Sequence, residues 1–214
     1  MRYTLIIAIL TLFLSCTEKD KKTGYSLVYQ QNFDQQEAIN DFEFSNPEKW
    51  KWNDGLLECM GRGDYKPPFR SPFIVSRIKD IEVSDFVFEA DLKQTGREYG
   101  HRDMCIFFNY KDNKHFYYCH IATKPDNHAH NIFIVNEAAR VKIAEHVSSG
   151  VNWGNNWHRM RLERNTKTGD IALYFDDMET PIMKANDKTF TTGQVGIGSF
   201  DDQGAIDNIR LFSH

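Results

Sequence analysis

Short segments with a two-residue hydrophobic period constrain the fold of this chain more than any other feature. In residues 85–92, Phe86, Phe88, Ala90 and Leu92 alternate with residues that are mostly polar. This alternation is typical of a β-strand with one buried face. Similar short runs cover residues 26–31, 104–110, 116–122, 131–136, 157–164, 171–176, 194–200 and 205–212.

Turn residues separate these runs, and residues 165–170, which contain Gly169, are predicted to form a hairpin loop. Only residues 35–42 and 136–144 have a composition that allows a turn of helix. Many short strands at this spacing indicate an all-β protein, with an antiparallel two-sheet sandwich or jelly roll. No internal repeat is visible, so we expect residues 25–214 to form one domain.

The beginning of the chain predicts export. Arg2 precedes the apolar residues 5–14, and Ser15 and Cys16 follow. This pattern resembles a bacterial lipoprotein signal in which Cys16 becomes the lipidated first residue. A transmembrane anchor is a weaker alternative, because a spanning helix needs about 20 apolar residues.

We therefore expect residues 1–15 to be a signal peptide and residues 16–24 to be a flexible lipidated tether. The charged residues 17–22 contain nothing that needs burial. The expected location is the outer membrane or the cell surface, held by the lipid anchor, on either the periplasmic or the outer side.

Charge and cysteine content exclude other classes. The net charge of −4 and the lack of a long basic run argue against nucleic acid as a partner. Cys59, Cys105 and Cys119 remain besides Cys16. Their odd number and wide spacing indicate neither a disulfide framework nor a structural zinc motif, so we expect buried apolar residues.

One hairpin is specific enough for its register to be predicted. If residues 111–114 form the turn, with Asp112 and Asn113 at its tip, residue 105 lies opposite residue 120. One face is then apolar and belongs to the core: Met104, Ile106, Phe108, Tyr117, Cys119 and Ile121. The other face mixes aromatic and polar groups and is predicted to line a ligand groove: Asp103, Cys105, Phe107, Asn109, Phe116, Tyr118 and His120.

Histidines gather at this hairpin: five of the eight lie between His101 and His130. Imidazole changes charge near neutral pH, so it suits proton transfer, metal ligation or anion pairing. The predicted catalytic residues are His101, Arg102, Tyr118 and His120, and the predicted substrate-binding residues are Arg97, Phe107, Phe116, Lys124, His130 and Asn131.

Two alternatives stand beside this prediction. His101, Arg102 and His120 could instead form a hydrogen-bonded trio that only fixes a loop. His128 and His130 could ligate a metal, although a zinc site needs a third ligand.

Several motifs in residues 25–214 resemble the concanavalin A-like jelly-roll domains named after 3-keto-disaccharide hydrolase. They are residues 86–92, the GHRD segment 100–103 that enters MCIFF, and residues 155–164, 174–177, 193–200 and 207–211. Members of that group are exported by carbohydrate-degrading bacteria, so the resemblance implies a glycan ligand.

Related sandwiches often hold a calcium ion that ties the first strand to the last. The resemblance implies Asp207 as its carboxylate ligand, with Asp34 nearby. An acidic turn without metal is the alternative.

Two function classes remain open. The first is an enzyme, hydrolase or lyase, in which His120 or Tyr118 transfers a proton while Arg102, Lys124 or Asn131 neutralises developing charge. This set suits β-elimination from a uronic acid or cleavage beside a 3-keto sugar. The second is a non-catalytic carbohydrate-binding lipoprotein. Several titratable groups on one face favour the enzyme.

Glu89 and Asp91 offer a different catalytic pair. They partly resemble the paired acids of jelly-roll glucanases, but Lys93 stands where that pattern has a third acid. An ordinary polar outer strand face is the alternative.

Overall fold

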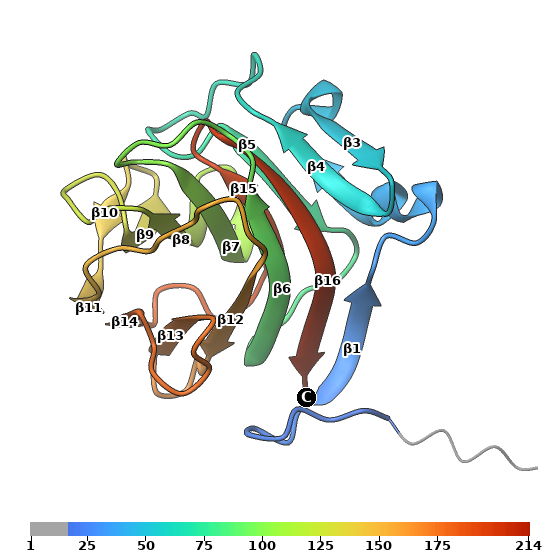
Figure 1. The fold of residues 1–214 in the computed structure, drawn as a ribbon. Coiled ribbons are helices and arrows are strands. Elements are labelled where there is room, and N and C mark those ends of the chain that lie inside the picture. The colour runs from blue at the N-terminus through green and yellow to red at the C-terminus, as the bar shows by residue number, and fades with distance from the viewer. Residues whose placement is uncertain (1–16) are drawn as a thin grey trace, which may run out of the picture.

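The computed structural model describes residues 17–214, which form two antiparallel β-sheets packed face to face (Figure 1). The expected signal peptide and Cys16 lie outside the described residues. In chain order, the elements are β1 (Ser26–Gln31), η1 (Gln36–Asp41), β2 (Phe42–Phe44), η2 (Pro47–Lys49), β3 (Trp50–Asn53), β4 (Leu56–Met60), β5 (Ile74–Ile78), β6 (Phe86–Gln94), β7 (Asp103–Asp112), β8 (His115–Ala122), β9 (Asn131–Asn136), β10 (Val141–Lys142), β11 (Ala144–Val147), β12 (His158–Arg164), β13 (Asp170–Phe175), β14 (Met183–Asn186), β15 (Gln194–Ser199) and β16 (Gln203–Ser213).

The larger sheet has the strand order β11-β14-β13-β12-β6-β16-β4-β3, and β1 pairs with the C-terminal half of β16. The smaller sheet has the order β10-β9-β8-β7-β15-β5-β2. Figure 1 shows the long, curved strands β6 and β16 side by side, with the C-terminus next to the start of β1. The predicted all-β, two-sheet jelly roll is confirmed.

The space between the sheets holds the residues that the alternation assigns to it. Phe86, Phe88, Ala90 and Leu92 of β6 are fully buried. They share one core cluster with all six residues of the apolar hairpin face. Burial of this apolar surface is the main force that holds the two sheets together.

The hairpin β7-β8 has the predicted register in its inner part, where Cys105 pairs with His120 and Phe107 with Tyr118. The turn itself is shifted. Asp112 pairs with His115, and a bulge between Phe108 and Asp112 restores the register. At this bulge Asn109 has a φ of 42°, a left-handed conformation that asparagine tolerates better than most residues.

The predicted turn of helix near residue 40 is confirmed as η1, but the one over residues 136–144 is wrong. That segment completes β9 and forms β10, where Val141 pairs with Ile134. A β-branched residue paired at a sheet edge is more favourable there than a short isolated helix. The short strands β2 to β5, β11 and β14 were not predicted.

Residues 17–24 are not a free tether. Asp20 is only 8% exposed and lies against the outer face of the larger sheet, where Arg161 donates to it at 2.7 and 3.1 Å. The turn after Asp20 is closed by Thr23, whose backbone and hydroxyl both donate to the same carboxylate at 2.7 Å. The expectation of a flexible spacer is therefore corrected, because these charges have partners on the sheet.

Within residues 17–214, no helix has the length and apolar character needed to cross a membrane.

Candidate functional site

A pocket of about 240 Å³ opens where β7 and β8 meet the loop after β15. We call it the His120 pocket. Its titratable and charged lining comes from loops and strands far apart in the sequence: Arg70, Tyr99, His101, Asp103, His120, His128, Arg140 and Asp201.

His120 is the least satisfied polar residue of this pocket. It is 3% exposed, and neither ring nitrogen has a hydrogen-bond partner among residues 17–214. Its Nε2 lies 3.4 Å from Oδ2 of Asp103, close enough for an ion pair. The ring stacks on Phe200 with centroids 5.8 Å apart. Buried polar groups are nearly always hydrogen-bonded, so an imidazole with only this 3.4 Å contact has bonding capacity left for a ligand.

Asp103 is fully buried beside it. Its Oδ1 accepts from the Ser199 hydroxyl at 3.1 Å, and its Oδ2 accepts from the Phe200 amide at 2.9 Å and from the Cys105 thiol at 3.1 Å. Burial by itself raises the pKa of the Asp103 carboxyl, but His120 and these donors outweigh burial and lower it. Asp103 is thus an ionised carboxylate beside the imidazole.

Asp201 lines the pocket beside Asp103, and Asp202 lies next to both carboxylates. With Asp103 they offer three oxygen atoms within 4.8 Å of one another. Burial and the neighbouring Asp103 raise the pKa of Asp202 to about 7. Oδ2 of Asp202 accepts from the Tyr99 hydroxyl at 2.9 Å and from the backbone of Asp103 at 3.0 Å.

Arg140 is a pocket residue that sequence reasoning missed. Its guanidinium donates to the Tyr118 hydroxyl at 2.8 Å and to the His128 carbonyl at 2.7 Å. It lies over the rings of Phe133 and Phe200, so its position is fixed before any ligand binds. Arg140 lies in the turn after β9, where no pattern marked it as functional.

The predicted catalytic residues do not all meet in this pocket. His101 is at the rim, with Nε2 2.5 Å from Asp126. Arg102 is buried and points elsewhere, donating to the carbonyls of Gln94 and Gly154 at 3.0 and 2.7 Å. Arg102 therefore fixes the loops around it, as in the alternative in which His101, Arg102 and His120 only hold a loop in place.

The aromatic half of the predicted groove is not open. Phe107 and Tyr118 are fully buried, and Phe116 is 2% exposed. They form a second apolar cluster with residues of β5 and β9, and Phe69 of the segment between β4 and β5 packs against it. An open groove is therefore absent over these three residues, because aromatic neighbours cover them. Only the end of this face at His120 reaches a pocket.

His130 and Asn131 have structural contacts instead. Nδ1 of His130 accepts from the Ala122 amide at 3.3 Å, and its Nε2 lies 2.9 Å from the Ser148 hydroxyl. Burial lowers the pKa of His130 to about 4, so the ring is neutral. With both ring nitrogens engaged, His130 does not form a metal pair with His128. Asn131 accepts from the Ala144 amide at 3.4 Å.

Arg97 and Lys124 are exposed, outside the His120 pocket. The Arg97 guanidinium lies 5.0 Å from the ring of Tyr99. Lys124 and Arg102 line a neighbouring hollow of about 270 Å³.

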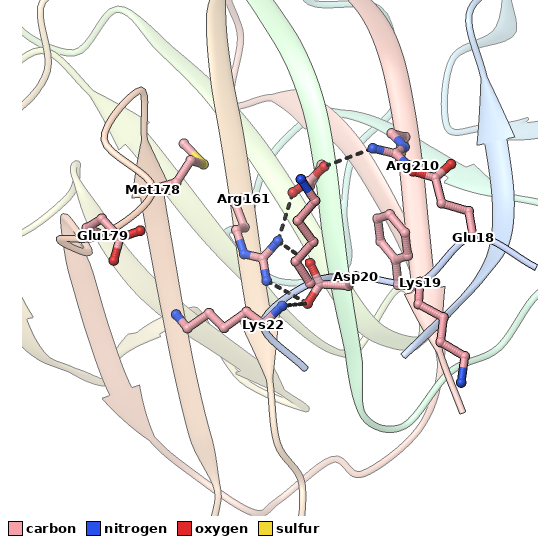
Figure 2. A pocket seen from close by; sticks show the side chains of 11 residues that line it. Glu18, Lys19, Asp20, Lys22, Arg161, Met178, Glu179 and Arg210 are labelled. Atoms are coloured by element: carbon pink, nitrogen blue, oxygen red, sulfur yellow. Dashed lines mark hydrogen bonds and ion pairs between the residues drawn. The ribbon is translucent and has the colours of Figure 1, made fainter. Parts of the chain in front are cut away.

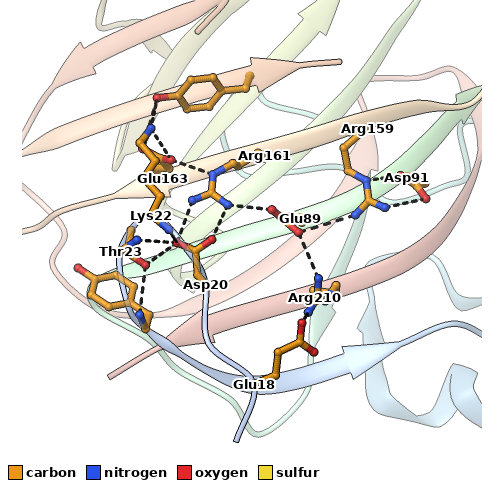
Figure 3. Close-up of polar contacts among 12 residues, drawn as sticks. Glu18, Asp20, Lys22, Thr23, Glu89, Asp91, Arg159, Arg161, Glu163 and Arg210 are labelled. Atoms are coloured by element: carbon orange, nitrogen blue, oxygen red, sulfur yellow. Dashed lines mark hydrogen bonds and ion pairs between the residues drawn. The ribbon is translucent and has the colours of Figure 1, made fainter. Parts of the chain in front are cut away.

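Glu89 and Asp91 lie on the outer face of the larger sheet and are ion-paired. Glu89 accepts from Arg161 at 2.8 Å and Asp91 from Arg159 at 2.7 Å (Figure 3). We call the cluster of Asp20, Glu89, Arg161, Glu163 and Arg210 the outer-face network. Carboxylates held by arginines in this way suit stability better than glycoside hydrolysis.

A larger hollow of about 340 Å³ lies on this same outer face, beneath residues 18–22 (Figure 2). Arg161 and Asp20 point toward each other at its floor. Because these charges are paired with one another, the hollow has less capacity for a ligand than the smaller His120 pocket.

Asp207 lies on β16, where it pairs with Asp91 of β6, and Asp34 of the segment after β1 is close enough for its charge to act on it. Burial, followed by the carboxylates of Asp91 and Asp34, raises the pKa of Asp207. Oδ1 of Asp207 accepts from the Asn208 amide at 2.7 Å at a bulge of β16, and Asp34 accepts from Asn32 at 2.7 Å. Acidic oxygens are thus concentrated where the expected calcium would bind.

Comparisons with known proteins give the fold. No family model matches, and no curated protein matches the sequence. Among solved structures, the chain is similar to the carbohydrate-binding module CBM66 from Bacillus subtilis, with a TM-score of 0.62 and 19% identity over 81% of this chain and 96% of that one. Lectin I-B4 from Griffonia simplicifolia gives a TM-score of 0.54 and 13% identity over 86% and 97% of the two chains.

A xylan beta-1,4-xylosidase from Bacillus halodurans is similar over only 39% of its length and 86% of this chain, with a TM-score of 0.60 and 12% identity. These structures share the jelly-roll fold with this protein. Their names associate that fold with carbohydrate binding and with carbohydrate hydrolysis.

Proposed function

We propose that this protein cleaves a glycosidic bond of an oligo- or polysaccharide in the His120 pocket. The observation that carries the proposal is the buried, unpaired imidazole of His120 beside the buried carboxylate of Asp103. His120 lines the pocket, so its imidazole is placed to take up a proton from a bound sugar. The carbohydrate-related neighbours of the fold support a glycan as the ligand.

Arg140 and Arg70 supply positive charge on the same pocket. In β-elimination, loss of a proton beside a carboxylate or ketone leaves negative charge on oxygen, which a fixed guanidinium stabilises. Arg140 is held by Tyr118 and His128, so it needs little reorganisation when that charge develops. This arrangement is compatible with both sugar chemistries suggested by the sequence, a uronic acid and a 3-keto sugar.

Non-catalytic binding is the second candidate, and the similarity to a carbohydrate-binding module favours it. Binding modules hold sugars on exposed aromatic rings. Here Phe107, Phe116 and Tyr118 are buried, which favours the enzyme.

A screen of the purified protein against a panel of neutral and uronic-acid glycans, with mass detection of products, tests the proposal. Hydrolysis adds the mass of one water to the products, whereas elimination adds none and creates an absorbing double bond. Binding without chemistry leaves all masses unchanged. We expect product formation that His120→Ala abolishes; glycan binding with unchanged masses across the panel would favour the second candidate.

Export and anchoring are part of the proposal. The apolar residues 5–14 before Cys16 support lipidation of that cysteine. Cys16→Ala should release the protein from the membrane fraction. A mature chain that begins at a residue other than 16 would contradict the anchor.

A calcium ion between the first and last strands completes the proposal. Asp207 and Asp34 are its candidate ligands, and the raised pKa of Asp207 supports a cation there, because a nearby positive charge would offset the crowded carboxylates.

A further inference from the structure

We infer that Asp103, Cys105 and His120 bind a zinc-class divalent ion at the bottom of the His120 pocket. One oxygen, one sulfur and one nitrogen atom from these residues lie within 4.8 Å of one another. Cys105, expected from sequence to be a buried apolar residue, is therefore a ligand through its thiol.

The sheet brings the three side chains together. Asp103 and Cys105 are two residues apart on β7 and so share one face of the strand. His120 is the partner of Cys105 on β8 and projects from the same face of the sheet. Because strand pairing fixes all three, the site is formed before the ion arrives.

The distance between Nε2 of His120 and Oδ2 of Asp103 matches that of a tetrahedral site. With the usual zinc bond lengths, tetrahedral geometry places oxygen and nitrogen ligands about 3.4 Å apart, and oxygen and sulfur ligands about 3.6 Å apart. Nε2 of His120 is 3.4 Å from Oδ2 of Asp103, and Sγ of Cys105 is 3.1 Å from the same oxygen. A small outward movement of the sulfur completes the geometry.

His120 provides an independent observation. Its side chain is 4% exposed, yet its nitrogens have no hydrogen-bond partner within the part of the chain that the structure describes. A buried unpaired nitrogen lowers stability. A metal bond at Nε2 would give one of these nitrogens its partner.

Charge balance also favours the ion. The Asp103 carboxylate and a Cys105 thiolate together neutralise one divalent ion. On binding, the ion takes the place of the proton that the thiol donates to Asp103, and this proton leaves to solvent. The donors Ser199 and Phe200 hold the carboxylate in place, as outer contacts commonly do around metal ligands.

The donor types select the metal. Sulfur and imidazole nitrogen favour zinc, and disfavour calcium, which prefers oxygen. The all-oxygen group of Asp103, Asp201 and Asp202 is less suitable, since Asp202 already accepts from Tyr99 and from the Asp103 backbone.

Three protein ligands leave a fourth position, as in catalytic zinc sites. Asp103 and His120 line the pocket, so this position faces the space where a ligand binds. There the ion would activate a bound water molecule or sugar hydroxyl by favouring loss of its proton to solvent. In the metal-bound protein that group, and not His120, would be the base. This role rests on the proposed function, whereas ion binding itself does not.

Cobalt substitution of the full-length protein tests the site, with metal content measured after dialysis. A bound cobalt ion with a cysteine ligand gives thiolate-to-metal absorption in the near ultraviolet. We expect about one ion per chain and this absorption, and we expect Cys105→Ser to weaken zinc affinity at least about 100-fold. Cys119→Ser is the matched control, because Cys119 is also buried but faces the core between the sheets, and it should keep both signals.

Circular dichroism and thermal unfolding of the metal-free variants establish that they fold. His120→Gln provides a second ligand variant and should also lose affinity while the thiolate band weakens. Absence of bound metal in the folded parent protein overturns the inference, as does equal affinity of the parent and Cys105→Ser. If glycan cleavage is found and persists after chelation, the catalytic role of the ion fails, while ion binding and the proposed function hold. If the metal binds but no glycan product forms, the proposed function fails while the inferred metal site holds.

Discussion

Two clusters of charged residues on opposite sides of the molecule differ in how completely their polar atoms are paired. In the outer-face network, Arg161 donates to Asp20, Glu89 and Glu163 at 2.7 to 2.8 Å (Figure 3). In the His120 pocket, the imidazole has no hydrogen-bond partner within residues 17–214. Both clusters are rich in titratable groups, but only the second has bonding capacity left for a ligand.

Strand pairing explains the difference. On the outer face, acidic and basic residues are direct cross-strand partners: Arg161 faces Glu89 and Arg159 faces Asp91. Such opposite-charge pairs stabilise a sheet. In the hairpin, His120 faces Cys105 and Tyr118 faces Phe107, so the direct cross-strand partner of His120 carries no opposite charge. A candidate site therefore differs from a structural network in its polar atoms that lack hydrogen-bond partners, more than in its number of titratable residues.

Replacing His120 gives the largest expected effect. His120→Leu should lower kcat/KM for the cleaved glycan by about two to four orders of magnitude, the usual cost of losing a group that transfers a proton. Stability should change little, since the removal of poorly paired buried nitrogens is offset by the loss of the ion pair with the buried Asp103 carboxylate. Kinetics and urea unfolding of the same preparations check both outcomes. A marked loss of stability with normal activity would place His120 among the structural residues.

Replacing Arg161 should have the opposite effect, with a loss of stability and no loss of glycan binding. Arg161→Ala leaves Asp20, Glu89 and Glu163 without their shared partner, and breaking a buried ion pair costs about 3 to 5 kcal/mol. The free energy of unfolding should fall by that amount while glycan affinity is unchanged. Asp20→Asn should cost less and expose residues 17–24 to proteolysis. Unchanged stability of Arg161→Ala would remove the distinction between the two clusters.

His130 offers a buried histidine whose ring is fully paired. Its pKa is lowered by burial to about 4, below the value near 6.5 of an unfolded chain. As the pH falls from about 6.5 to about 4, the unfolded state takes up a proton that the folded state does not. Stability should therefore fall by on the order of 3 kcal/mol over this range, and this term is absent above it.

Unfolding curves at several pH values test the term. His130→Asn removes the titration, and asparagine tolerates the φ of 49° at this position. The variant should lose stability less steeply on acidification than the parent protein. If the free energy of unfolding falls equally steeply with pH in the variant and in the parent protein, His130 does not titrate as its burial requires.

Local pattern predicted the sheets and the hairpin register, because alternation and cross-strand pairing depend on neighbouring residues. It did not predict that Phe69 covers the aromatic end of the hairpin, since the segment between β4 and β5 has no periodicity. Nor did it reveal Arg140 in the pocket or the inward turn of Arg102. Contacts between segments far apart in the chain decide these positions, and a single sequence carries no local signal for such contacts. Residues 17–22 were misjudged for the same reason: their side-chain partners lie on β12, β13 and β16.

Calcium binding at Asp207 and Asp34 should have the smallest effect on stability. The polar atoms of this cluster are less completely paired than those of the outer-face network and more completely than those of the His120 pocket. Asp91 is already paired with Arg159, whereas Asp207 has only the Asn208 amide as its donor among the described residues. A cation at Asp207 and Asp34 would bind the folded state alone and stabilise it by RT ln(1 + [L]/Kd), about 1.4 kcal/mol at a calcium concentration ten times Kd. Thermal unfolding with calcium and with a chelator should differ by a few degrees, and Asp207→Asn should remove the difference. If Asp207→Asn shows the same shift in unfolding temperature as the parent protein, the calcium ion binds elsewhere. Cys105→Ser should keep the calcium response, because the Cys105 sulfur belongs to the other metal site.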